Sequence, residues 1–89
     1  MRAIITVTGK DRPGIIAGVC VLLSESNINI LDISQTVMQD FFTMTMLIDL
    51  SGCEKSFAEV SDSLDAKGKE MGLIIRVQRE DIFDRMHRI

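Results

Sequence analysis

The chain has 89 residues, a formal net charge of −3 and a pI near 5.0, so we expect a single acidic domain. An acidic chain lacks the basic stripe that nucleic-acid binding requires, and no run of about 18 apolar residues is present to cross a membrane. The first residues contain no extended apolar region followed by a small-residue cleavage site. We therefore expect no secretory signal and a cytoplasmic location.

The two cysteines, Cys20 and Cys53, match no Cys-x-x-Cys metal or redox motif. Two reduced thiols in an intracellular protein are the simplest interpretation. A chain this short buries only about 60% of the surface that its unfolded form exposes, so its core gives marginal stability. Because no disulfide or metal is expected to supplement that core, association with a second copy is indicated.

The first strand and helix are predicted from a change in hydrophobic period. Residues 2–8 alternate β-branched side chains with a period of two, which is typical of a strand with one apolar face. A turn cluster follows over residues 9–14, and apolar residues then recur at helical spacing. Since proline favours the first helical position, the helix is expected to begin at Pro13, with Asp11 or Arg12 as its N-cap.

A hairpin is predicted in the middle of the chain. Residues 27–29 end the helix, and strands are expected over residues 30–38 and 41–50, joined by a turn at residues 39–40. Two strands this close in sequence pair antiparallel. The apolar residues that share one face are Leu31, Ile33 and Val37 in the second strand and Phe42, Met44, Met46, Ile48 and Leu50 in the third.

A second helix and a fourth strand complete the predicted fold. The helix covers residues 54–71 with Gly72 as its stop, the strand covers residues 73–78, and residues 79–89 form a short C-terminal helix. Two right-handed βαβ crossovers around a hairpin predict an α+β, ferredoxin-like βαββαβ two-layer sandwich over residues 1–89. Its four-stranded antiparallel sheet has both helices on one face, and the opposite face carries both polar and apolar residues: Ile4, Thr6, Thr8, Ser34, Thr36, Phe41, Thr43, Thr45, Leu47, Ile74 and Arg76.

The turn before the first helix is the segment most indicative of function. A helix N-terminus offers unpaired amides and the positive end of the helix dipole, which suit a carboxylate. Gly14 has no Cβ, so a ligand can approach the backbone, and Asp11 can receive an ammonium group. Together they would hold the two ends of an α-amino acid. The alternative is that Pro13 and Gly14 simply begin a helix.

A helix N-terminus alone is too weak to hold a metabolite. The dipole contributes only about 0.3–1 kcal/mol at an exposed site, whereas millimolar binding requires about −4 kcal/mol. A second surface that contacts the ligand is therefore needed, and a neighbouring subunit could supply it through Asn27 and Asn29. Alternatively, each asparagine has a structural role only, as a helix C-cap or a turn residue.

The segment Gly-Lys-Asp-Arg-Pro-Gly-Ile-Ile-Ala at residues 9–17, followed by Leu-Leu at 22–23 and Asn-Ile-Asn-Ile at 27–30, resembles the signature of the ACT domain family. The likeness covers essentially the whole chain and is strongest to small stand-alone ACT-domain proteins, whose tails resemble residues 78–89. The chain is also similar to the ACT domains of the glycine-cleavage-system regulator and of formyltetrahydrofolate deformylase.

The resemblance implies side-by-side dimers with a continuous eight-stranded sheet and an effector, often an amino acid, bound at their interface. It gives most weight to Asp11, Gly14, Ile15 and Asn29, whereas Arg12 is expected to face solvent or a partner. The sequence thus predicts a regulatory homodimer that binds an amino acid, without a cofactor, catalysis, nucleic acid or a membrane. The full candidate ligand-binding set is Asp11, Arg12, Pro13, Gly14, Ile15, Asn27 and Asn29.

Three alternatives stay open. The first is a ligand-free module that docks onto a metabolic enzyme through the mixed sheet face or the tail. The second is a minor hydrolase of the acylphosphatase type, for which Arg12 and Asn29 are suitable residue types but the family's glycine-rich loop is missing. The third is a metal site in the tail, where Glu80, Asp84 and His87 share one helical face; no metal site is predicted, because a solvated face is the commoner arrangement.

Overall fold

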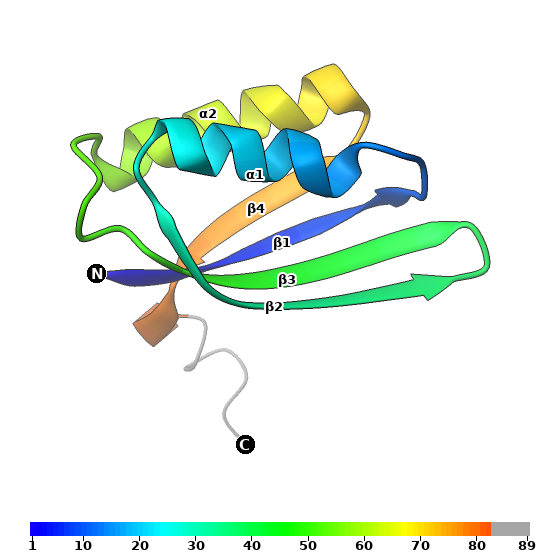
Figure 1. Ribbon diagram of the computed structural model, residues 1–89, viewed down its shortest axis with the longest axis horizontal. Helices are drawn as coiled ribbons and strands as arrows, with labels where there is room; N and C mark the ends of the chain where they lie inside the picture. The colour runs from blue at the N-terminus through cyan, green and yellow to red at the C-terminus, as the bar shows by residue number, and fades with distance from the viewer. Residues whose placement is uncertain (83–89) are drawn as a thin grey trace.

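The computed structural model describes residues 1–82 and confirms the βαββαβ order (Figure 1). Residues 80–82 are helical, at the beginning of the expected C-terminal helix. Residues 83–89, including Asp84 and His87, lie outside the described residues. The elements are β1 (Arg2–Lys10), α1 (Ile15–Glu25), β2 (Asn29–Met38), β3 (Phe41–Asp49), α2 (Phe57–Met71) and β4 (Ile74–Arg79).

The four strands form one antiparallel sheet in the order β2-β3-β1-β4, so β2 and β4 are its outer edges. Both helices lie on one side of the sheet, as Figure 1 shows, and the predicted ferredoxin-like sandwich is confirmed. The opposite side is called the open face below. No helix within residues 1–82 combines the length and apolar character needed to span a bilayer.

The core lies between the sheet and the two helices and follows the alternation of the strands. The inward residues predicted for the third strand are confirmed, because Phe42, Met44, Met46, Ile48 and Leu50 are all buried. Burial of each large apolar side chain contributes roughly 1.5–3 kcal/mol. The other buried residues of the core are Ala3, Ile5, Val7, Ile15, Val19, Leu23, Ile28, Val60, Leu64, Leu73 and Ile75.

α1 does not begin where the sequence predicts. Its first residue is Ile15 rather than Pro13, and its N-cap is Gly14, with φ 90°, rather than Asp11 or Arg12. This left-handed conformation carries little steric cost only for glycine, and it places the bend one residue after the proline. Residues 11 and 12 are held elsewhere in the fold, as described below, so neither caps the helix.

β2 is also less buried than its sequence pattern suggests. Leu31 falls in a β-bulge between Ile30 and Asp32, so it does not continue the face formed by Ile33 and Val37. Ile33 and Val37 lie opposite the buried residues Met46 and Phe42, yet they remain 43% and 51% exposed. The helices cover the inner strands but leave this edge bare.

α2 begins at Phe57, later than the predicted residue 54, because Ser56 and Glu59 form a reciprocal capping box. The predicted stop at Gly72 is confirmed by its left-handed conformation, with φ 70°. Gly68 lies inside α2, where a Cβ would stand 2.8 Å from the carbonyl oxygen of Leu73. This close approach brings the helix against β4.

We expect Gly68→Ala to destabilise the protein by about 1–3 kcal/mol, although alanine normally strengthens a helix. The added methyl would press against backbone that cannot move aside. The matched control is Gly18→Ala in α1, whose Cβ would meet only the flexible side-chain ends of Met71 and Lys67. Its expected change is less than about 1 kcal/mol. Urea unfolding of both variants measures the difference, and equal stabilities would contradict the packing described.

Candidate functional site

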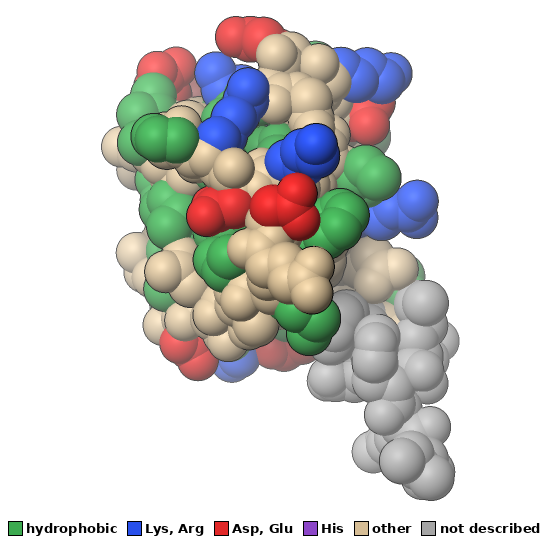
Figure 2. All heavy atoms as spheres, turned by 90° about the vertical axis from the view of Figure 1, so that its right-hand side faces the viewer, with side chains coloured by type: hydrophobic (Ala, Val, Ile, Leu, Met, Phe, Trp, Pro, Cys, Tyr) green, Lys and Arg blue, Asp and Glu red, His purple; other side chains and the backbone are tan. Residues whose placement is uncertain are grey.

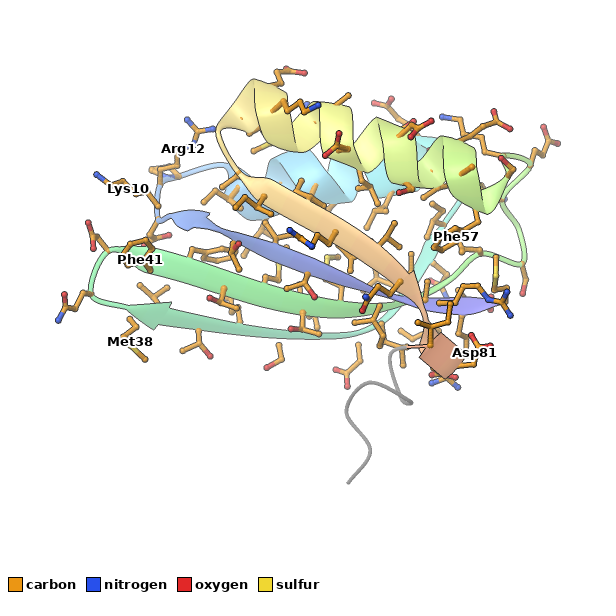
Figure 3. All side chains as sticks on the ribbon, turned by 180° about the vertical axis from the view of Figure 1, so that it is seen from behind. Lys10, Arg12, Met38, Phe41, Phe57 and Asp81 are labelled. Carbon is orange, nitrogen blue, oxygen red and sulfur yellow. The ribbon has the colours of Figure 1, made fainter. Side chains whose placement is uncertain are left out.

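The β1–α1 loop, residues 11–14, is anchored at two points. The Asp11 amide donates a hydrogen bond to the carbonyl oxygen of Asp40 in the β2–β3 turn, at 2.8 Å. The Arg12 guanidinium donates to the carbonyl oxygen of Met71 at the C-terminal end of α2. Figure 3 shows Arg12 close to that end of α2, with Lys10 and Phe41 below it. The loop therefore has a defined position between the hairpin turn and α2.

The N-terminus of α1 is open to a ligand. No side chain caps it, and the first backbone bond of the helix is that of the Gly18 amide to the Gly14 carbonyl, so the preceding first-turn amides lack an intrahelical acceptor. Gly14 is exposed, and nothing lies within 4 Å of where its Cβ would be. The Ile15 side chain is buried, so this residue offers its backbone rather than its side chain.

A carboxylate lies beside these amides. Asp11 is exposed, and within residues 1–82 its carboxylate takes part in no ion pair. Figure 2 faces this end of the molecule and shows acidic and basic side chains side by side with hydrophobic ones. The loop thus presents hydrogen-bond donors for an anion next to an acceptor for a cation.

Asn27 and Asn29 lie at the other end of α1. The helix has 11 residues and is about 16 Å long, so one amino acid cannot touch both ends within one chain. Asn27 has φ 57°, and its side-chain amide donates to the carbonyl oxygen of Gly52 at 2.8 Å, as expected for a turn residue. Asn29 is exposed at the first position of β2. The fold therefore brings Asp11, Arg12, Pro13, Gly14 and Ile15 together but separates them from both asparagines.

A surface hollow of about 510 Å³ lies at the asparagine end, between α1 and the start of β2. We call it the Cys20 hollow. Sequence reasoning singled out its two asparagines but missed Cys20 and Ser24. Their spacing to Asn27, at positions i, i+4 and i+7, was the available signal for one helical face. The lining residues are Cys20, Ser24, Asn27, Ile28, Asn29 and Ile30.

Asp49 is the cross-strand neighbour of Asn29. Its carboxylate accepts hydrogen bonds from the Ser51 hydroxyl at 2.6 Å and the Ser51 amide at 3.0 Å. The hydroxyl, followed by the amide, lowers the pKa of the Asp49 carboxyl below its ordinary value. The carboxylate is therefore ionised at neutral pH and already has local partners.

The structure also places the residues of the other candidate sites. Arg12 and Asn29, the residue types of an acylphosphatase site, lie at opposite ends of α1 and form no common site within the chain. Glu80 forms an ion pair with Arg2 at 2.8 Å, whereas its expected partners in the tail lie outside the described residues. No group of three or more His, Cys, Asp or Glu residues suited to a metal occurs in residues 1–82. Both cysteines are free.

Comparison with known proteins places this geometry in a family. The model of the ACT domain matches residues 2–78. A UPF0237 protein of Clostridium acetobutylicum is 58% identical over 100% of both chains. Among solved structures, an ACT domain protein from Streptococcus pneumoniae is 40% identical, with a TM-score of 0.83 over 94% of both chains.

A second structure connects the fold to regulation in another protein. A protein described as a glycine cleavage system transcriptional repressor is 31% identical, with a TM-score of 0.76, and the match covers 86% of this chain and 44% of that one. The family model covers most of the chain, and these relatives match it in sequence and in fold. The chain therefore belongs to the ACT domain family.

Proposed function

We propose that the protein is a regulatory homodimer that binds an amino acid and has no catalytic activity. The observation that carries the proposal is the uncapped N-terminus of α1 at Gly14, open to solvent beside the carboxylate of Asp11, which forms no ion pair within residues 1–82. Amides would hold the ligand's carboxylate, and Asp11 would hold its ammonium group. Two free thiols, Cys20 and Cys53, support a reducing compartment such as the cytoplasm.

The edge strand β2 is the surface through which we propose that two copies pair. It has ten residues, none of them Lys or Arg, and residues 31–40 are all exposed. The other edge, β4, has six residues and carries Arg76 and Arg79. Long edges without basic residues invite pairing, whereas short edges that carry them resist it. A second copy would also cover Ile33 and Val37.

Antiparallel pairing of two β2 strands would complete the site. In such a pair the start of one strand lies beside the end of the other. Asn29 begins β2, and the turn that follows β2 is bonded to the β1–α1 loop through Asp40 and Asp11. Each loop would therefore face Asn29 of the other protomer. This arrangement supplies the second ligand-contacting surface that one chain lacks.

Calorimetric titration against the common amino acids tests the proposal. We expect binding by the natural protein and none by Gly14→Leu, because the new side chain occupies the space through which a ligand reaches the amides. Leucine at this positive φ also strains the backbone by about 1–2 kcal/mol. Gly72→Leu is the matched control, since Gly72 has φ 70° and equally open surroundings but caps α2. Unchanged binding by Gly14→Leu would refute the site.

A docking module is the second candidate function. The observation that favours it is a set of exposed apolar residues at the hairpin end of the open face, where Met38, Phe41 and Ile74 are 71%, 61% and 60% exposed. Figure 3 shows Met38 and Phe41 at this end. Binding to a metabolic enzyme that is lost in Phe41→Ser, but unaffected by amino acids or by Gly14→Leu, would favour docking over ligand sensing.

A further inference from the structure

We propose that the Cys20 hollow receives the side chain of the bound amino acid and selects ligands whose side chain is uncharged. This inference rests on the proposed function, because it assigns the part of the ligand that the loop does not hold. The loop of one protomer would bind the carboxylate and ammonium groups. The hollow of the other protomer would surround the side chain.

The size of the hollow suits this role. Its volume of about 510 Å³ is within the range of roughly 300–1,000 Å³ that small-molecule sites occupy. It lies beside the first residues of β2, where the antiparallel pair places the partner's loop. A ligand held at that loop can therefore extend its side chain into the hollow without leaving the amides.

The lining determines which side chains fit. Cys20 and Ile30 offer apolar surface, while Ser24 and Asn29 offer neutral hydrogen-bonding groups. None of the six lining residues is charged. A charged ligand side chain would lose water there without gaining an opposite charge, which is strongly unfavourable.

Charged side chains near this end of α1 line a second surface hollow. A smaller hollow of about 220 Å³ adjoins the first at Asn27, and its lining includes Glu25, Glu54 and Lys55. Lys55 contacts the Ser26 hydroxyl at 3.4 Å. Glu25, Glu54 and Lys55 therefore line a neighbouring surface. The carboxylate of Asp49, the cross-strand neighbour of Asn29, is bonded to Ser51, and Asp49 does not line the Cys20 hollow.

Titration with alanine, serine, valine, aspartate and lysine tests the selectivity. We expect the best neutral amino acid to bind at least about tenfold more tightly than aspartate or lysine. Ser24→Asp should reverse the preference for neutral amino acids over lysine, because it places a carboxylate in the hollow. Ser24 is exposed, so the core is undisturbed. Ala66→Asp, on the exposed side of α2, adds the same charge elsewhere and should leave the preference unchanged.

The two cysteines provide an independent measurement. Both are half-buried, but Cys20 lines the hollow and Cys53 lies in the loop before α2. We expect the tightest-binding neutral amino acid to slow modification of Cys20 by N-ethylmaleimide at least about fivefold, measured by mass spectrometry. Modification of Cys53 should keep its rate.

The outcomes separate the two proposals. If none of the five amino acids binds, and none of the other common amino acids does, the proposed function fails and this inference with it. If binding depends on Gly14 but charged and neutral amino acids bind equally, the proposed function stands and the neutral subsite is wrong. Failure of Ser24→Asp to shift the preference, with Cys20 unprotected, leads to the same conclusion.

Discussion

Mixing two variants, neither of which binds the amino acid by itself, is expected to restore about a quarter of the wild-type binding sites. One variant, Gly14→Leu, has a blocked loop and an intact hollow. The other, Asn29→Leu, has an intact loop and loses the amide that the partner's loop needs. In a mixed dimer, the intact loop of the second variant faces the intact hollow of the first. Each mixed dimer therefore regains one of its two sites.

The fraction follows from random pairing. Equal amounts of the two variants give mixed dimers as about half of the total, and one site in two works in each of them. Calorimetric stoichiometry of the mixture measures the recovered sites. Native mass spectrometry of the same sample verifies that the subunits have exchanged. Exchange without any recovered binding would show that the site is not shared between protomers.

Gln35→Pro is expected to convert the dimer to a monomer while leaving the protomer folded. The Ile33 amide donates to the Asp32 carboxylate at 2.8 Å rather than to β3, so it points to the free edge. Because backbone amides two residues apart in a strand point to the same side, the Gln35 amide also points to the free edge. Proline removes this donor without breaking a bond to β3, and proline is tolerated on such an edge.

The size of this effect follows from symmetry. Loss of a paired donor costs about 1–3 kcal/mol, and a two-fold interface contains the change twice, which gives about 2–6 kcal/mol. Sedimentation equilibrium measures the dimer dissociation constant, and circular dichroism verifies the fold. Gln35→Thr is the control, because it retains the amide and should remain dimeric. A dimeric Gln35→Pro protein would place the interface on another surface.

The elements that local chemistry controls were predictable from the sequence. The alternation of Phe42, Met44, Met46 and Ile48 identified the inner face of β3, and all four are buried. Gly72 identified the end of α2, because a left-handed C-cap favours glycine. The start and N-cap of α1 were predicted wrongly because distant contacts act there: Arg12 is bonded to Met71, 59 residues away, and α1 begins later than its proline suggests.

The candidate site was predictable in part, for a related reason. The loop from Asp11 to Ile15 is continuous in sequence, so its residue types and spacing indicated a helix N-terminus that binds anions. The Cys20 hollow combines residues of α1 and β2, and its depth depends on how the helix packs against the strand. Spacing on α1 can align Cys20 with Ser24, but it cannot show that a hollow lies between them and Ile30.

By itself, the sequence determined the order of strands and helices, the inner face of β3 and the family to which the chain belongs. These features follow from hydrophobic period and local turn chemistry, which act over a few residues. Only the tertiary structure decided that Gly14 rather than Asp11 or Arg12 caps α1 and that the apolar residues Ile33 and Val37 of β2 stay exposed. Those outcomes depend on which surfaces the helices cover, and that is set by packing between segments far apart in the chain.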